Sequence, residues 1–166
     1  ASDAMTGTRP NILLACNSYV RQEYLDSGDL ERLELFADWD WFECEGGNIY
    51  NAPEEGAFAS RLADRIGDYD GVIVAHGSPK LTAAILDRAP NLKIVGELEG
   101  DRFAARIDLD ACWERDIRTV DTTNASSYPV AEWALGLILI SLRNIGTQFR
   151  RMISGEPRDN EMTPYG

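Results

Sequence analysis

One histidine stands where it can act on a bound molecule. His76 is the only histidine of the 166 residues, and it directly follows the apolar run Gly71–Ala75. Imidazole exchanges protons near neutral pH and both donates and accepts hydrogen bonds. Gly77 and Ser78 follow it and add backbone N–H groups and a hydroxyl. If Gly71–Ala75 is a parallel strand, these residues lie at its carboxyl end, where doubly wound sheets bind ligands. Two interpretations stay open: a substrate contact, or a partly exposed loop histidine without a role.

The three cysteines indicate neither a metal centre nor a disulfide framework. Cys16, Cys44 and Cys112 are odd in number and form no Cys-x-x-Cys or Cys/His spacing, so no metal site is predicted. Cys16 ends an apolar run with no base expected nearby, which favours a buried small apolar residue over a nucleophile. We expect reduced thiols and a cytoplasmic protein.

Short apolar runs alternate with stretches of helical periodicity, a pattern typical of a parallel sheet with helices on both faces. The expected strands are Asn11–Cys16, Trp39–Cys44, Gly71–Ala75, Leu92–Gly96 and Ile117–Asp121. The expected helical stretches are Asp29–Asp38, Glu54–Ile66, Leu81–Arg88 and Asp108–Arg115. Trp39–Cys44 alternates in polarity, which indicates a sheet edge. The pattern predicts an α/β fold, a flavodoxin-like doubly wound parallel five-stranded sheet.

A long helix follows the fifth strand. Ser126 or Ser127 can cap it, and Pro129 falls in the first turn, where its missing N–H costs nothing. From Val130 to Leu142 the apolar residues surround the helix rather than forming a stripe. Leaving about six such side chains in water forgoes on the order of 10 kcal/mol of burial. The helix therefore needs a second surface, from another domain or another subunit; the alternative is a central helix of an ordinary core.

Composition excludes several partners. The chain is 44% hydrophobic and 27% charged, as globular domains are, and its net charge of -12 disfavours nucleic acids and anionic membranes. The apolar run Trp133–Leu142 is about half of the ~20 residues that a bilayer span needs. No signal peptide is visible in residues 1–10.

Three segments in succession resemble one enzyme family. Asp70–Gly96 holds Pro-Lys-Leu-Thr and then Ala-Pro-Asn-Leu-Lys-Ile-Val, Ile107–Asp121 begins Ile-Asp-Leu-Asp-Ala, and Ser127–Leu142 holds Val-Ala-Glu. In this order and spacing they resemble the substrate-binding domain of the D-isomer-specific 2-hydroxyacid dehydrogenases, with the long helix that crosses to the dinucleotide-binding domain.

The resemblance implies an NAD(P)-dependent oxidoreductase that transfers hydride between nicotinamide and a 2-hydroxy or 2-keto acid. Its partners would be a small-molecule substrate and a second copy, a homodimer through the Val130–Leu142 helix. The family's dinucleotide fingerprint Gly-x-Gly-x-x-Gly does not occur in these residues, and the catalytic residues are expected in the NAD-binding domain. We therefore expect NAD or NADP in the complete protein, and neither cofactor binding nor activity from these residues alone.

Position by position, the resemblance also assigns contacts. The residues expected at the substrate are His76, Gly77, Ser78, Glu99, Gly100 and Arg102, and those expected at the cofactor are Asn124 and Val130. The family's glycine-flanked loop binds the substrate carboxylate through backbone N–H groups. Here the loop carries Glu97, Glu99 and Asp101 instead, and these carboxylates would repel a bound carboxylate. Either Arg102 and Arg106 neutralise them, or the substrate is not a simple 2-hydroxy acid.

Four parts are expected along the chain. They are a tag remnant or disordered start (1–8), the flavodoxin-like domain (9–123), the interdomain or dimerisation helix (124–153) and a linker (154–166) toward an NAD-binding domain that this sequence lacks. The alternative function is a non-catalytic flavodoxin-like binding or dimerisation module. A flavin-binding protein would need a Ser/Thr/Gly-rich loop where Cys16–Val20 stands, and a phosphoacceptor receiver would need an Asp in place of Ala75.

Overall fold

The computed structural model describes residues 9–47, 50–100 and 103–157, and the chain divides between Thr123 and Asn124 into two compact units. The tag remnant expected at 1–8 and the linker residues 158–166 lie outside the described residues. The two units are described separately below.

The first unit is built on a five-stranded, all-parallel sheet with the order β2-β1-β3-β4-β5. The strands are β1 (Asn11–Asn17), β2 (Asp38–Cys44), β3 (Gly71–Val74), β4 (Ile94–Glu97) and β5 (Arg118–Asp121). This order confirms the predicted flavodoxin-like doubly wound sheet. β2 forms an edge, as its alternating polarity predicts, while β1 is buried on both faces.

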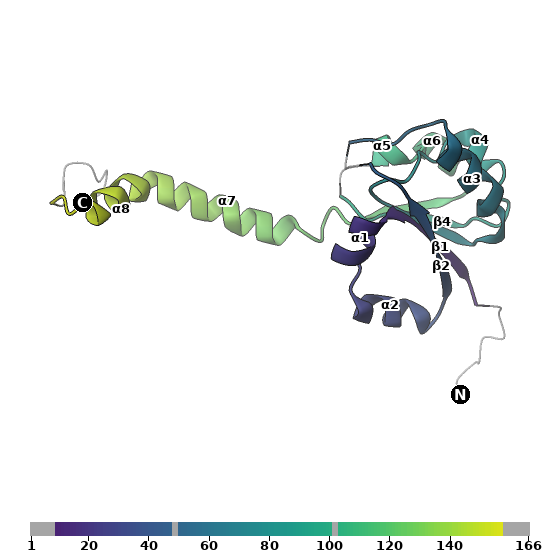
Figure 1. Cartoon of the computed structure of the whole chain (residues 1–166), viewed down its shortest axis with the longest axis horizontal. Helices are drawn as coiled ribbons and strands as arrows, with labels where there is room; N and C mark the ends of the chain where they lie inside the picture. The colour runs from purple at the N-terminus through teal and green to yellow at the C-terminus, as the bar shows by residue number, and fades with distance from the viewer. Residues whose placement is uncertain (1–8, 48–49, 101–102, 158–166) are drawn as a thin grey trace. The chain divides into compact units, whose positions relative to one another are not determined.

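Helices cover both faces of the sheet (Figure 1). They are α1 (Ser18–Glu23), α2 (Ser27–Glu34), α3 (Ala57–Arg65), the 3-10 turn η1 (Ile66–Asp68), α4 (Ala83–Leu86), α5 (Phe103–Arg106) and α6 (Leu109–Trp113). The larger core packs α3, α4 and α6 against one face around Leu13, Val72 and Val95. The smaller core packs α2 against the other face around Ile12 and Leu14.

The helix predicted at Asp29–Asp38 corresponds to α2 but begins and ends too late. The structure has two helices, α1 and α2, and residue 38 already begins β2. Each helix begins at a side-chain cap: the Asn17 Oδ1 accepts from the Val20 N–H at 3.0 Å, and the Asp26 Oδ1 accepts from the Gly28 N–H at 2.7 Å. α5 is a further element that the sequence pattern did not predict.

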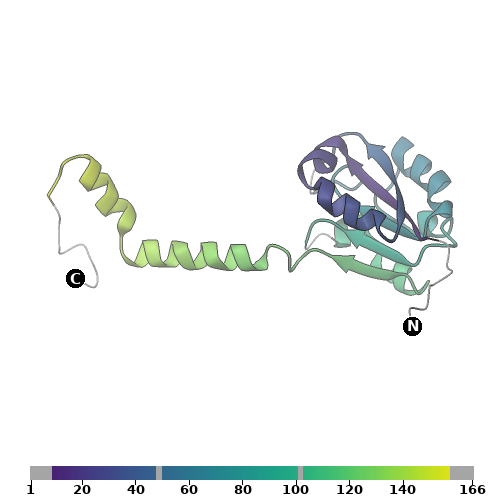
Figure 2. The same cartoon turned by 90° about the horizontal axis from the view of Figure 1, so that it is seen from below.

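The α2 face of the sheet is only partly covered. In Figure 2, α1 and α2 lie over the purple and blue strands, while the green strand β5 faces the viewer without a helix of the same unit over it. A hollow of about 290 Å³ lies there, lined mainly by apolar side chains such as Ile73, Ile94 and Val120. Ile94 and Val120 are consequently 37% and 49% exposed.

The second unit contains α7 (Ser127–Leu142) and α8 (Ile145–Ile153), where the sequence predicts one helix over 124–153. The two axes meet at 65°, and Asn144 between them has a left-handed φ of 51°. Asparagine tolerates this conformation better than most residues, so it accommodates the break. Neither helix contains a buried residue. Among the described residues, no single helix is long and apolar enough to cross a membrane, and α7 with α8 meets that criterion only as a bent pair.

Candidate functional site

The carboxyl ends of three parallel strands bring the candidate residues together. Asn17 ends β1, His76 follows β3, and Glu97 ends β4. The backbone N–H of Asn17 donates to the His76 carbonyl at 2.7 Å, and its side-chain amide donates to the Gly46 carbonyl at 2.9 Å. Asn17 therefore connects the loops that follow β1, β2 and β3.

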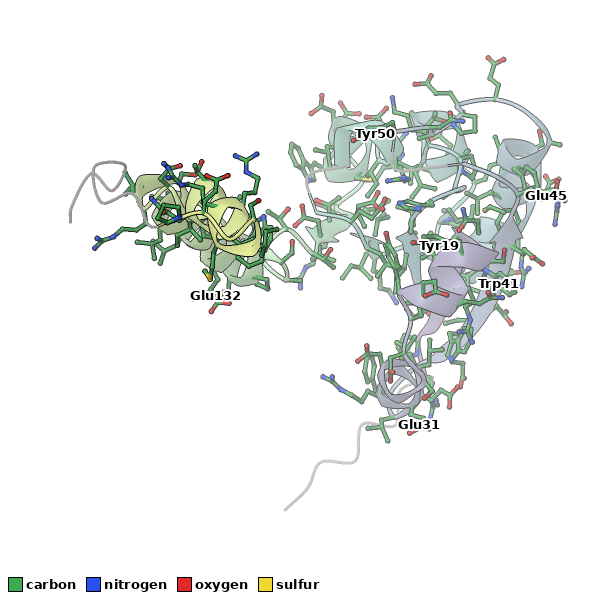
Figure 3. The ribbon with its side chains drawn as sticks, turned by 60° about the vertical axis from the view of Figure 1, so that its left-hand side comes forward. Tyr19, Glu31, Trp41, Glu45, Tyr50 and Glu132 are labelled. Carbon is green, nitrogen blue, oxygen red and sulfur yellow. The ribbon has the colours of Figure 1, made fainter. Side chains whose placement is uncertain are left out.

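His76 is buried against a carboxylate and two aromatic rings. It is 7% exposed, and its Nε2 contacts the Oε1 of Glu99. A carboxylate at this nitrogen favours the tautomer with the proton on Nε2. The Tyr19 ring lies nearly parallel to the imidazole, 6.3 Å away between centroids, and the Tyr24 ring meets its edge at 5.6 Å. Tyr19 belongs to α1 and is labelled in Figure 3.

Arg106 holds the two carboxylates of this edge. Its side chain is fully buried, and its Nη1 lies 2.9 Å from the Glu99 Oε2 and 3.4 Å from the Glu97 Oε2. A parallel bridge between Leu81 and Ile107, with the Leu81 N–H donating to the Arg106 carbonyl at 2.7 Å, fixes its backbone. Arg106 thus places one cation between these two carboxylates, and the neutralisation of the whole loop by Arg102 and Arg106 stays a prediction, because Arg102 lies outside the described residues.

The carboxyl of Glu97 is inaccessible to solvent. Burial is the main cause that raises its pKa to about 7, and the neighbouring Arg106 only partly opposes this. Its Oε1 accepts a hydrogen bond from the Glu99 N–H at 3.3 Å. With two carboxylates and one guanidinium, this buried group carries a surplus negative charge whenever Glu97 is ionised.

Two glycines of the predicted site occupy positions that admit no side chain. Gly77 has a φ of 86°, and a Cβ there would lie 2.9 Å from the Gly46 carbonyl oxygen. A Cβ on Gly100 would lie 2.6 Å from the Cα of Thr123. Both glycines thus allow close backbone packing, whatever contact they make with a ligand.

Apart from Gly100, which is described above, the predicted site residues fall into four groups. His76 and Glu99 are in contact, and Gly77 follows in the same loop. Ser78 is fully buried, and its hydroxyl donates to the Pro79 carbonyl at 2.9 Å. Arg102 lies outside the described residues. Asn124 and Val130 belong to the second unit, where both are exposed.

Five residues of the site were not among the predicted contacts: Asn17, Tyr19, Tyr24, Glu97 and Arg106. Asn17 has a usable signal, because an Asn between an apolar run and a helix is typical of an N-cap. The tyrosines carry no such signal, since their position depends on α1, which the periodicity did not reveal. The sequence offers Arg106 as a neutralising charge, but sequence spacing alone does not place it between the carboxylates of Glu97 and Glu99.

The chemistry available here is that of a histidine held by a carboxylate. Burial raises the pKa of Cys16 to about 11, of Cys44 to about 12 and of Cys112 to about 11, so these thiols are poor nucleophiles at neutral pH. Within the described part of the chain, no three His, Cys, Asp or Glu side chains are grouped to hold a metal ion. His76 can donate a hydrogen bond or exchange a proton.

Comparison with known proteins agrees with this architecture. The model of the family "D-isomer specific 2-hydroxyacid dehydrogenase, catalytic domain" matches residues 42–156. The chain therefore belongs to this family, whose description names oxidoreductases that act on 2-hydroxy acids. The match includes β3, β4 and the loop that carries Glu97 and Glu99.

Two curated relatives illustrate the likeness. D-3-phosphoglycerate dehydrogenase of Methanocaldococcus jannaschii is 33% identical over 101 residues, 61% of this chain and 19% of that protein. Hydroxyphenylpyruvate reductase of Plectranthus scutellarioides is 28% identical over 136 residues, 81% of this chain and 36% of that protein. The chain thus spans between about a fifth and two fifths of the length of these relatives.

Solved structures share the fold at low sequence identity. D-mandelate dehydrogenase of Rhodotorula graminis superposes with a TM-score of 0.60 and 22% identity, covering 90% of this chain and 41% of that one. A 2-hydroxyacid dehydrogenase of Ketogulonicigenium vulgare Y25 gives 0.57 and 21%, covering 90% of this chain and 41% of that one. They support the doubly wound fold.

Proposed function

We propose that the protein containing this chain is an NAD(P)-dependent oxidoreductase that transfers hydride between a nicotinamide and a 2-hydroxy or 2-keto acid. The family match over residues 42–156 carries this proposal. The convergence of His76 and Glu99 at the carboxyl edge of the sheet supports it, because ligands of doubly wound sheets bind at that edge.

In this proposal the first unit supplies the substrate side. His76, oriented by Glu99, hydrogen-bonds the substrate, and the backbone of Gly77, Ser78 and Gly100 shapes the loops around it. Arg102 is included by its place in the same loop. The buried Arg106 keeps Glu99 in position and does not itself reach the substrate, because its guanidinium already contacts two carboxylates.

The nicotinamide, when bound, supplies or accepts the hydride. We assign Asn124 and Val130 to the surroundings of the nicotinamide ring. Val130 is 62% exposed, so its own unit leaves it accessible. These 166 residues contain no Gly-x-Gly-x-x-Gly, so we assign them no role at the dinucleotide phosphates. We expect negligible NAD(H) affinity for the chain alone, to be checked by calorimetry.

We also propose a homodimer through α7. From Val130 to Leu142 its large apolar side chains remain 45% to 71% exposed, and the largest of them, Trp133, is the most exposed. A second copy would cover this surface. The three free, buried cysteines suit a reducing, cytoplasmic location.

The function is tested by assaying the complete protein with NADH and NADPH against a panel of 2-keto acids, following loss of the reduced nicotinamide. Reduction of at least one member is expected. His76→Gln and Glu99→Gln should raise KM more than they lower kcat, because both residues act on substrate binding. Absence of hydride transfer with every acid and both cofactors would overturn the proposed function.

A further inference from the structure

The charged groups beside His76 already contact one another. Each oxygen of the Glu99 carboxylate has a partner, His76 on one side and Arg106 on the other. The guanidinium of Arg106 also contacts Glu97. Among the described residues of this cluster, no cation remains for a second negative group on a ligand. Asp101 and Arg102, which lie outside them, add one charge of each sign.

The surface left to a ligand at this edge is aromatic. Tyr19 and Tyr24 are 55% and 45% exposed, although both rings pack on the buried imidazole of His76. The two tyrosine rings meet edge to face, 5.8 Å apart between centroids. Exposed aromatic faces bind other flat rings by offset or edge contacts. The Tyr19 and Tyr24 hydroxyls add polar groups without a full charge.

The surplus charge of the cluster works against anions. Glu97, Glu99 and Arg106 together are neutral or negative, depending on Glu97. A phosphate group adds nearly two negative charges and three strong acceptors, which pair best with cations such as arginine. A cationic substituent is not favoured either, because both Glu99 oxygens are occupied.

From these contacts we infer that the site selects 2-hydroxy or 2-keto acids with an uncharged aromatic side chain, which stacks on Tyr19 and Tyr24, and discriminates against phosphorylated ones. This inference rests on the proposed function and names its substrate class. Tyr19 and Tyr24 are then specificity-determining residues, distinct from His76. Glu99 and Arg106 are positioning residues, because Glu99 contacts His76 and Arg106 contacts Glu99.

The test compares phenylpyruvate with 3-phosphohydroxypyruvate in the complete protein, by kcat/KM and by calorimetry of the corresponding hydroxy acids. The expected preference for the phenyl compound is at least tenfold. Tyr19→Leu/Tyr24→Leu should lower kcat/KM for phenylpyruvate on the order of tenfold, mainly through KM, whereas Tyr19→Phe/Tyr24→Phe should retain most of it. Phe36→Leu is the matched control. Phe36 is also an exposed aromatic residue, at 63%, but it precedes the start of β2 and so lies at the amino ends of the strands, away from His76.

The outcomes separate the two proposals. Preference for the phosphorylated acid, or equal loss in the Leu and Phe double variants, would overturn the substrate class while the oxidoreductase function stands. If no acid is reduced, the proposed function fails; calorimetric binding of the phenyl compound that depends on Tyr19 and Tyr24 would then still support the aromatic site. Absence of that binding would overturn both.

Discussion

Two regions of this molecule reverse the usual distribution of residues, in opposite ways. At the carboxyl edge of the sheet, the charged side chains of Glu97 and Arg106 are fully buried. On α7, large apolar side chains such as Trp133 and Leu135 are exposed. Soluble domains ordinarily place each kind the other way round.

The two regions differ in whether they are satisfied by their own unit. Every carboxylate of the buried cluster contacts Arg106, so the first unit itself supplies the partner that offsets part of the cost of desolvation. α7 buries no residue and has no such compensation within its unit. The comparison teaches that the charged cluster finds its partners within the first unit, whereas the exposed apolar surface of α7 supports the proposal that another subunit covers it.

The largest effect is expected from removing the shared cation. Arg106→Met leaves two carboxylates buried without their partner, and breaking such a pair costs about 3–5 kcal/mol of the free energy of unfolding. Urea denaturation followed by circular dichroism measures it. The control is Arg88→Met, which removes an exposed ion pair with Asp64 and should cost at most about 1 kcal/mol. Similar losses in both variants would show that the buried cluster is not self-contained.

A somewhat smaller effect is expected from pH. The pKa of Glu97 is raised from 4.5 to about 7 in the folded protein, so the folded state holds a proton that the unfolded state has released between these values. Its contribution to stability is therefore fully present below pH 4.5 and is lost as the pH rises to about 7, by about 3 kcal/mol in total.

Glu97→Gln removes this titration. The difference in the free energy of unfolding between Glu97→Gln and the unchanged protein should grow by about 3 kcal/mol in favour of the variant from pH 4 to pH 8, in a series of urea titrations. Parallel profiles for the two proteins would mean that Glu97 is ionised in the folded state throughout, and that Arg106 outweighs burial.

The smallest free-energy effect is expected on α7. Ile138→Glu/Ile140→Glu places charges on two sides of the helix, because residues two apart differ by about 200° around its axis. We expect the dimer dissociation constant to rise at least tenfold by sedimentation equilibrium, with no loss of stability in the first unit. Leu35→Glu, at a position 80% exposed in the first unit, should leave the dissociation constant unchanged. A chain that is monomeric before substitution would remove the basis for assigning α7 to a partner.

The sequence predicted the sheet more completely than the site. Apolar runs such as Asn11–Cys16 and Gly71–Ala75 are local, so their period and order were sufficient to give five parallel strands and the edge position of β2. The site depends on contacts between distant loops. His76 and Glu99 come together only because β3 and β4 are neighbours. Arg106 reaches Glu99 because the Leu81–Ile107 bridge fixes its backbone.

Two local features were missed for a different reason. α1 and α5 are six and four residues long, too short for a helical period to be visible. The break between α7 and α8 depends on the backbone conformation of Asn144, which composition does not reveal. Short elements and backbone torsions are decided by tertiary packing, so the tyrosines carried by α1 remained outside the predicted contacts.

The central claim, that the edge around His76 is the substrate side, is tested most directly by NMR. In the complete protein, the imidazole signal of His76 is the one that disappears in His76→Gln. Titration with 2-hydroxy-3-phenylpropanoate in the presence of oxidised nicotinamide cofactor is predicted to shift this signal saturably, at the concentrations that give half-maximal turnover. A signal that stays in place while the enzyme is saturated would contradict the assignment.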